Sequence, residues 1–501
     1  RPFDPALGNR RNGVVLINSS NNQIGGTAPG LGNVIALNGE DGIRIVNGGG
    51  NRIEGNTIGI DGGPPILVGG VPVLPPSFGN GLNGIALIQS INNVIGGSLS
   101  NAGNLIIANQ QSGVLIGGSS STGNRVQGNI IGLDATGERA VANGGHGLSI
   151  LGGNNNLIGG SAAGEHNLLS GNAGFGLLIE PESGLGGQGN RILGNRVGTN
   201  GTGLKAVGNT SGGIKLSNVF GNLIGGAAAG EGNLISGNDA AGIWIFAQSV
   251  LPQGNVIRGN LIGLSATGQN GLGDGNSTHG ILVENSASTI IGGAAPGERN
   301  VIAGNPLSGI SLVGLGGVGS MILGNLIGLN ATGSLNIGGT QVGVSIASPG
   351  VILGGDSPSA GNVISGHRIG VLIDPISGFG ATIQGNLIGT SADGSSDVGN
   401  REAGILLNGA GMAGATASSP LRILGNVISG NGDAFNNGYG IRLLGPAATA
   451  AVIAGNFVGT NKSGSMAIGN SFVGISLEAG ARNVVIGGST AADRNIISGN
   501  G

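Results

Sequence analysis

One hexapeptide, close to Asn-Val-Ile-Ser-Gly-Asn, returns eight times along the chain. Its copies begin at Asn33, Asn104, Asn167, Asn233, Asn300, Asn362, Asn426 and Asn495. Successive copies are 71, 63, 66, 67, 62, 64 and 69 residues apart, an average of 66. A regular period of this length is typical of repeat architectures, in which each unit buries its apolar side chains by stacking on its neighbours. The repeat therefore predicts a solenoid before any local pattern is considered.

Each repeat holds three phrases of roughly 22 residues, in which aliphatic residues alternate with others at period two. Examples are Gly147 to Ile150 with Asn156 to Gly160, Gly242 to Ile245, and Gly254 to Gly263. Such runs predict short strands, bounded by Gly and Asn because both residues tolerate the left-handed backbone of a sharp turn. Stacking one phrase on the next predicts an all-β, right-handed parallel β-helix of about 22 residues per coil and about 23 coils, three coils per repeat. We expect residues 1–501 to form one continuous domain, a segment of a longer solenoid or a stackable fibre subunit.

Composition excludes several other classes. Glycine accounts for 114 of 501 residues, yet it does not recur at every third position, so collagen is excluded. Hydrophobic residues make up 39% and charged residues only 9%, which is unlike a disordered chain. The net charge is −3 without a basic stripe, so we expect no nucleic-acid partner. Gly and Asn interrupt every apolar run, so we expect no membrane span in this segment.

The repeat phrases resemble a known family. Asn93 to Gly97, Asn233 to Asn238 and Gly385 to Gly389 are similar to the right-handed parallel β-helix repeats of large bacterial cell-surface and extracellular proteins. Those proteins share the pectate-lyase-like fold, and the resemblance covers essentially the whole chain. It implies the fold, while adhesins, structural fibres, lyases and glycoside hydrolases all use that fold.

Two stretches depart from the repeat and are predicted to form loop insertions. Residues 61–80 are rich in proline, and residues 409–420 replace the Ile-Gly-Gly phrase of the seventh repeat. Insertions of this kind can build a binding face or simply vary as loops.

The sequence offers one catalytic lead, Gly145-His146-Gly147, which resembles the Gly-His-Gly segment of polygalacturonases. Other repeats place Asp41 and Phe175 at the position of His146, and the remaining segments of that family are missing. The closest acidic pairs are Glu180 with Glu182 and Asp393 with Asp397, which we interpret as exposed solubilising charges. The four histidines lack metal-ligand spacing. We therefore predict no catalytic, metal or cofactor site, and no cofactor.

The middle residue of each Gly-Ile-x-Ile phrase should point outward and form a column along the solenoid. Eight of its fifteen members are apolar. A semi-apolar stripe is a possible lateral contact, although isolated exposed aliphatics are also normal. Its predicted members are Leu115, Leu178, Trp244, Leu282, Leu372 and Leu406. The chain stops at Gly501, directly after the eighth hexapeptide, where the next strand should begin. End-to-end contact through Asn495, Ile496, Ile497 and Asn500 is therefore a further prediction.

These patterns favour a non-catalytic structural role. We expect an extracellular or bacterial cell-surface rod, a filament subunit or the stalk of an adhesin, that self-associates as a homopolymer or continues as a longer solenoid. The alternatives are a polysaccharide-active enzyme, a lyase or glycoside hydrolase, and an adhesin that binds a cell-surface polysaccharide without catalysis.

Overall fold

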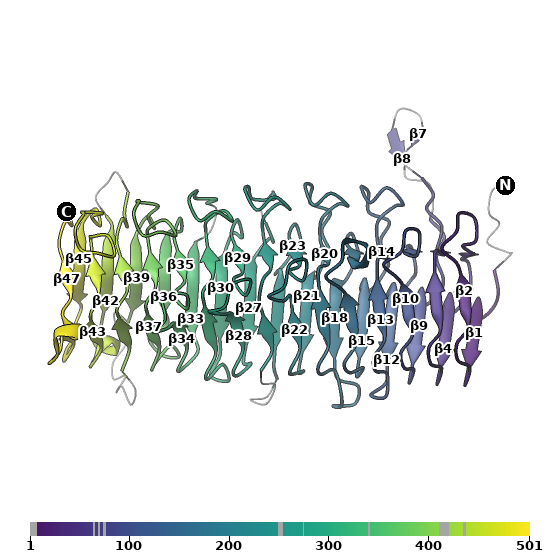
Figure 1. Cartoon of the computed structure of the whole chain (residues 1–501), viewed down its shortest axis with the longest axis horizontal. Helices are drawn as coiled ribbons and strands as arrows, with labels where there is room; N and C mark the ends of the chain where they lie inside the picture. Colours follow the sequence, from purple (N-terminus) through teal and green to yellow (C-terminus); the bar gives the residue numbers. More distant parts are fainter. Residues whose placement is uncertain are drawn as a thin grey trace. The chain divides into compact units, whose positions relative to one another are not determined.

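The computed structural model describes residues 8–63, 66–68, 71–73, 77–248, 254–273, 275–338, 341–409, 420–433 and 437–501. Contacts between residues group the chain into two compact units, residues 1–240 (unit 1) and 241–501 (unit 2), and each is described by itself. In both units the strands stack side by side in parallel sheets, as Figure 1 shows. The prediction that residues 1–501 form one continuous domain stays a prediction.

Unit 1 contains three parallel sheets, which we call A, B and C. The strands of sheet A are β1 (Val14–Ile17), β4 (Ile43–Val46), β9 (Ile85–Ile88), β12 (Val114–Gly117), β15 (Leu148–Leu151), β18 (Phe175–Glu180) and β21 (Gly212–Ser217). Those of sheet B are β2 (Gln23–Gly25), β5 (Arg52–Glu54), β10 (Val94–Gly96), β13 (Arg125–Gln127), β16 (Leu157–Gly159), β19 (Arg191–Leu193) and β22 (Leu223–Ile224). Those of sheet C are β3 (Val34–Ile35), β6 (Thr57–Ile58), β11 (Leu105–Ile106), β14 (Ile130–Ile131), β17 (Leu168–Leu169), β20 (Arg196–Val197) and β23 (Leu234–Ile235).

Unit 2 repeats the arrangement with the same three sheets. Its sheet A strands are β24 (Ile243–Phe246), β27 (His279–Glu284), β30 (Ser308–Val313), β33 (Val342–Ala347), β36 (Ile369–Ile373), β39 (Ala403–Asn408), β42 (Tyr439–Leu444) and β45 (Val473–Glu478). Its sheet B strands are β25 (Val256–Ile257), β28 (Ile290–Gly292), β31 (Met321–Leu323), β34 (Ile352–Gly354), β37 (Thr382–Gln384), β40 (Arg422–Leu424), β43 (Val452–Ala454) and β46 (Val485–Ile486). Its sheet C strands are β26 (Leu261–Ile262), β29 (Val301–Ile302), β32 (Leu326–Ile327), β35 (Val363–Ile364), β38 (Leu387–Ile388), β41 (Val427–Ile428), β44 (Phe457–Val458) and β47 (Ile496–Ile497).

The only helices in the described part of the chain are three single 3-10 turns. They are η2 (Ala163–Glu165), η3 (Pro446–Ala448) and η4 (Ala491–Asp493). None of the described helices has the length and apolar character needed to cross a membrane. The predicted all-β, right-handed parallel β-helix fold is confirmed.

The predicted coil size and number are wrong. Equivalent inward residues of sheet A run from Val14 to Ile214 in six steps, which is about 33 residues per coil. In unit 2 they run from Ile243 to Ile475 in seven steps, again about 33. Each 22-residue phrase holds two aliphatic clusters separated by a turn, and therefore two strands. Because one coil uses three strands, each 66-residue repeat makes two coils, seven in unit 1 and eight in unit 2 within the described residues, not about 23 in all.

The core consists of aliphatic columns that run perpendicular to the strands. In sheet A, Ile43 and Ile45 of β4 are fully buried and pair in register with Ile85 and Leu87 of β9. Sheets B and C bury single columns through residues such as Ile53 and Ile58. The recurrent glycine just before or at the start of each sheet A strand leaves room for this core, since a Cβ on Gly84 would lie 2.7 Å from Cγ2 of Ile106.

Asparagine ladders join the coils at the turns. In the ladder that precedes sheet C, the side-chain Nδ2 of each Asn donates to Oδ1 of the Asn in the next coil at 2.9–3.1 Å. In unit 1 the ladder runs through Asn33, Asn56, Asn104, Asn129, Asn167, Asn195 and Asn233. Stacked amides satisfy buried backbone groups in each coil, so the recurring Asn of the hexapeptide has a structural role.

The two predicted loop insertions fall partly outside the described residues. Within 61–80, β7 (Ile66–Val68) and β8 (Val71–Val73) form an antiparallel pair that stands away from the stacked strands of unit 1 (Figure 1). Residues 64–65, 69–70 and 74–76 of that loop, and 410–419 of the loop at 409–420, lie outside the described residues.

Candidate functional site

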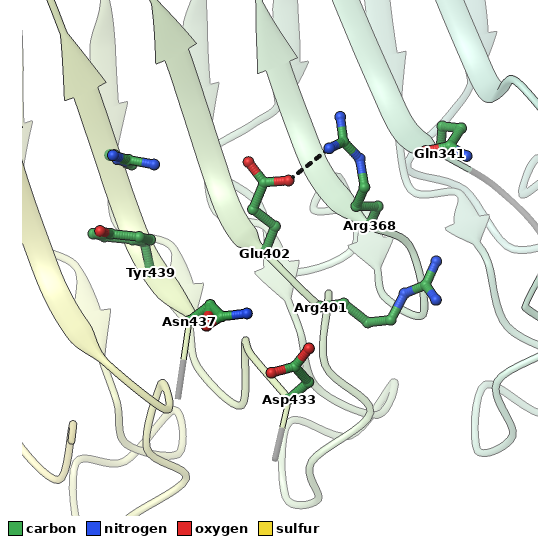
Figure 2. Close-up of a pocket in the computed structure, with 8 residues that line it drawn as sticks. Gln341, Arg368, Arg401, Glu402, Asp433, Asn437 and Tyr439 are labelled. Carbon is green, nitrogen blue, oxygen red and sulfur yellow. Dashed lines mark ion pairs between the residues drawn. The ribbon is translucent and has the colours of Figure 1, made fainter. Parts of the chain in front are cut away.

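An arginine-rich cleft lies on the outer face of sheet A in unit 2. It encloses about 580 Å³. Its lining residues, shown in Figure 2, are Gln341, Arg368, Arg401, Glu402, Asp433, Asn437, Tyr439 and Arg442. We call this site the arginine cleft.

The register of four successive strands brings these residues together. Ile369 of β36 pairs with Ala403 of β39, which places Arg368 beside Glu402. Backbone hydrogen bonds fix the alignment: the Glu402 N–H donates to the Arg368 carbonyl at 2.8 Å, and the Tyr439 N–H donates to the Glu402 carbonyl at 3.0 Å. The charged side chains therefore project from a rigid sheet edge.

The three arginines differ in their partners. A guanidinium nitrogen of Arg368 lies 2.9 Å from a carboxylate oxygen of Glu402. Arg442 donates two hydrogen bonds to Glu478, at 3.1 and 3.0 Å. These hydrogen bonds lower the pKa of Glu478 and raise the pKa of Arg442. Arg401 is exposed, and no ion pair with another described residue engages it. Arg401 is thus the cation most available to an incoming anion.

The other side of the arginine cleft is aromatic and apolar. The Arg442 guanidinium lies over the Tyr439 ring, 4.4 Å from its centroid, and Phe472 meets that ring edge-on at 5.3 Å. Tyr439 also packs on an apolar cluster on the same face of the sheet. The cluster contains Ile369, Ala403 and Leu406, with Leu372 and Leu444 beside them. The site therefore combines guanidinium groups with an aromatic and aliphatic surface.

A buried histidine lies next to the arginine cleft. His367 precedes Arg368 and occupies a position that asparagine takes in other coils of the ladder preceding sheet A. Its Nε2 lies 3.2 Å from the Ile327 carbonyl, and because a carbonyl only accepts, Nε2 carries the proton. Burial lowers the pKa of His367 to about 4. His367 is neutral at pH 7 and supplies no charge to the cleft.

The first sequence lead, His146, lies in unit 1 and packs against a neighbouring side chain. Its Nδ1 accepts a hydrogen bond from the Phe175 N–H at 2.9 Å, and its ring stacks on that of Phe175 at 5.7 Å. Burial lowers its pKa. Among the described residues no group of three or more histidine, aspartate or glutamate side chains is arranged to hold a metal ion.

The predicted outward column exists, with a difference in exposure. Leu115 pairs with Ser149, and Trp244 pairs with Leu282, as the column requires. Leu178 and Leu406 are only 6% exposed, because the neighbouring side chains of sheet A cover them. These two residues therefore contribute little to the exposed surface of the column, and their predicted role in lateral contact stays a prediction. Contact through Leu115, Trp244, Leu282 and Leu372 stays a prediction.

The predicted end-to-end contact also stays a prediction. Asn495 accepts a hydrogen bond from Nδ2 of Asn456 at 3.0 Å and so continues an asparagine ladder. Ile496 is half-buried in β47, whereas Ile497 is 47% exposed. Asn500 accepts a hydrogen bond from Nδ2 of Asn470 at 2.8 Å.

The arginine cleft was missed by the sequence analysis for a specific reason. Arg368 and Arg401 are 33 residues apart, the length of one coil, so they occupy adjacent coils. With the predicted coil length of 22 residues, Arg368 and Arg401 would not fall at equivalent positions of adjacent coils. With the correct period, a run of charged residues just before successive sheet A strands signals the site.

Comparison with known proteins concerns the fold. No protein-family model matches the chain, and no curated protein sequence matches it. A solved structure of the periplasmic alginate epimerase AlgG is similar, with 14% identity over 70% of each chain and a TM-score of 0.41. The A-module of the Azotobacter vinelandii mannuronan C-5 epimerase AlgE6 is similar over 83% of this chain and 89% of its own, with 13% identity and a TM-score of 0.33. The Dettilon tailspike protein matches over 79% and 62%, with 16% identity and a TM-score of 0.28.

The functional prediction is corrected at this point. The solved structures similar in fold include alginate epimerases, so the non-catalytic structural rod, and with it the expectation that the chain is not an enzyme, is not carried further. Likeness at this level of identity shows the fold alone, so any activity of this chain has to be argued from its own side chains. The chain has the right-handed parallel β-helix, or pectate-lyase-like, fold.

Proposed function

We propose that the chain binds and chemically modifies an acidic polysaccharide in the arginine cleft. The observation that carries the proposal is Arg401, exposed and engaged in no ion pair with the described residues, on the same face as Arg368 and the Tyr439 ring. A solvent-exposed cation in this position is available to an anionic ligand.

The chemistry of the lining residues fits a uronic acid. Guanidinium groups present planar, paired N–H donors that match a carboxylate. A sugar ring has polar edges and apolar faces, and aromatic side chains with a polar edge suit such a surface. Tyr439 supplies an aromatic face, while Gln341 and Asn437 supply amides. The −3 net charge of the chain gives no general attraction for anions, so binding depends on this local set.

The reaction class supported best is removal of the proton next to the uronate carboxylate. When that C–H bond breaks, negative charge moves onto the carboxylate, and Arg368 and Arg401 are placed to stabilise it. The hydroxyl of Tyr439 and the carboxylates of Glu402 and Asp433 are the groups of the cleft that can exchange protons. Return of a proton to the opposite face gives an epimer, and loss of the neighbouring glycosidic oxygen gives an unsaturated sugar.

The test uses purified protein and a panel of acidic and neutral polysaccharides. Epimerisation is followed by proton NMR in deuterated water, elimination by the ultraviolet absorbance of the unsaturated product, and binding by calorimetry. We expect Arg401→Ala to weaken binding of the acidic substrate about tenfold, the effect of losing one charge-assisted hydrogen bond. Arg125→Ala, which removes an exposed arginine of β13 in unit 1, is the matched control and should change affinity less than twofold.

The outcomes separate the possibilities. Equal affinities for acidic and neutral polysaccharides, or no effect of Arg401→Ala, would contradict the proposal. Reducing ends without an unsaturated product would indicate hydrolysis. Binding without any product would identify a carbohydrate-binding protein.

Location and assembly remain parts of the proposal. An acidic polysaccharide substrate is in keeping with a location outside the cytoplasm or at the bacterial cell surface, as predicted from the sequence. The periplasmic description of AlgG applies to that protein. Self-association of this chain stays a prediction.

A further inference from the structure

We propose that Glu402 sets the affinity of the arginine cleft for acidic ligands, because its carboxylate occupies on Arg368 the place that a carboxylate of the ligand takes. Ligand entry then exchanges one ion pair for another. The inference rests on the proposed function, and it names the residue that competes with an acidic ligand for the arginine cleft.

The geometry of the Arg368–Glu402 pair supports exchange. The pair is joined through one nitrogen–oxygen approach of 2.9 Å, and the side chains are 50% and 32% exposed. Both residues lie at the start of adjacent strands, with their backbones fixed by the sheet. In the view of Figure 2, Glu402 stands between Tyr439 and Arg368, and all three line the cleft. A ligand carboxylate that enters the cleft therefore has to compete with Glu402 for the guanidinium group of Arg368.

In the second ion pair of this face the carboxylate is exposed to a similar extent, but its contacts and its position differ. Arg442 contacts Glu478 through two hydrogen bonds and also covers the Tyr439 ring. Glu478 does not line the cleft. Ser476 donates a further hydrogen bond to Glu478 at 2.6 Å. The Arg442–Glu478 pair is therefore built to hold Tyr439 in place, whereas the Arg368–Glu402 pair is open to replacement.

Exchange has a clear consequence for selectivity. A uronate that displaces Glu402 gives Arg368 a new anionic partner, and its carboxylate also comes within the field of Arg401. A neutral sugar has no group that can replace the Glu402 carboxylate on Arg368, so it leaves the ion pair in place. Glu402 therefore competes with acidic ligands alone.

The experiment compares Glu402→Gln with the matched variant Glu478→Gln, which removes the same charge from the neighbouring pair. Affinities are measured by calorimetry for a uronic-acid hexamer and for its carboxyl-reduced, neutral counterpart. We expect Glu402→Gln to bind the acidic hexamer about fivefold more tightly, because a competing surface ion pair is removed. The neutral hexamer should change less than twofold with Glu402→Gln, and so should the acidic hexamer with Glu478→Gln.

The possible results are distinguishable. A gain of affinity is not expected of a damaged fold, so a tighter Glu402→Gln supports the exchange. Unchanged or weaker binding of the acidic hexamer by Glu402→Gln, with normal binding by the wild type, would overturn the exchange and leave the proposed function standing. An equal gain in Glu478→Gln would also overturn it, since the effect is then general electrostatics. Failure of the wild type to bind any acidic polysaccharide of the panel would overturn both.

Discussion

Two stretches of the outer face of sheet A carry an aromatic residue and a cation at equivalent positions, but one stretch is closely packed and the other borders a cleft. In unit 1, around β15 to β21, His146 stacks on Phe175 and Lys215 lies over the Phe175 ring at 5.5 Å, so that Phe175 is only 9% exposed. In unit 2, around β36 to β42, Arg442 covers Tyr439 at 4.4 Å, and Arg401 stays exposed at the edge of a cleft. Both stretches place an aromatic ring just before the sheet A glycine and a cation over it.

The difference shows that the backbone alone does not make a site here. The strand register is the same in both stretches, so what changes is whether neighbouring side chains satisfy one another. His146 accepts the Phe175 N–H, and its ring is used in packing. Arg401 has no such role, and the cleft beside it stays open. An unengaged charge next to an aromatic face is therefore the feature that separates a candidate site from a packed surface.

The turns next to the two stretches differ as well. In unit 1 the ladder that precedes sheet A passes through Asn143, Asn172 and Asn209, with side-chain amide bonds of 3.0 Å. In unit 2 His367 takes the place of an asparagine. Its Nε2 bond to Ile327 corresponds to the bond from Nδ2 of Asn172 to the Ile131 carbonyl, 3.1 Å. The histidine keeps one ladder hydrogen bond and adds a titratable group.

The largest effect should come from breaking the all-asparagine ladder. Asn172→Ala removes an almost fully buried amide that donates to Asn209, Ile131 and Ser170. Because the partners are left without this donor in the interior, we expect a loss of about 3 to 4 kcal/mol in unfolding free energy. Urea unfolding followed by circular dichroism measures it. Gln110→Ala, at an exposed amide of the same unit, should cost under about 0.5 kcal/mol, and equal costs would show that the ladder is not a major source of stability.

The second effect concerns acid stability in unit 2. The folded-state pKa of His367, about 4, lies below the ordinary value of 6.5, so the unfolded chain binds the proton more readily. The contribution of neutral His367 to the free energy of unfolding is complete above pH 6.5 and is lost as the pH falls from 6.5 to about 4. The loss is on the order of 3 kcal/mol.

His367→Asn should remove this part of the acid sensitivity while restoring the ladder amide. Urea unfolding at pH 7 and pH 4, followed by the fluorescence of the single tryptophan, Trp244, measures the change. His279→Asn is the control, since His279 is only half-buried and its Nδ1 forms a hydrogen bond with the Ser308 hydroxyl at 2.6 Å. If His367→Asn loses as much stability on acidification as the wild type, protonation of His367 is not the cause of the acid sensitivity.

The smallest effect should follow from removing the imidazole ring of His146, which packs on Phe175 in unit 1. His146→Ala leaves the Phe175 N–H without its acceptor, so we expect a cost of about 1 kcal/mol in unfolding free energy. Affinity for an acidic polysaccharide should change less than twofold, against the tenfold loss in Arg401→Ala. Loss of activity in His146→Ala with binding intact would reverse the comparison and place the reaction in unit 1.

The sequence supported the fold well and the site poorly. The returning hexapeptide and the period-two aliphatic runs predicted a parallel β-helix correctly, because stacked strands need the same residue types at every coil. The coil length was wrong because Asn-Gly turns inside a phrase resemble those between phrases. That error separated Arg368 from Arg401, and it hid the cleft.

The sequence by itself determined the repeating strands, the aliphatic columns and the asparagine turns, since these follow from local patterns repeated along the chain. Only the tertiary structure decided which residues become neighbours across coils: Arg368 with Glu402, Arg442 with Glu478, and His367 in line with Asn400. The physical reason is that a side chain in a solenoid contacts residues one whole coil away along the sequence. The number of residues in that coil depends on how many strands make up one coil. The length of the coil therefore decides which charged side chains lie side by side and form ion pairs.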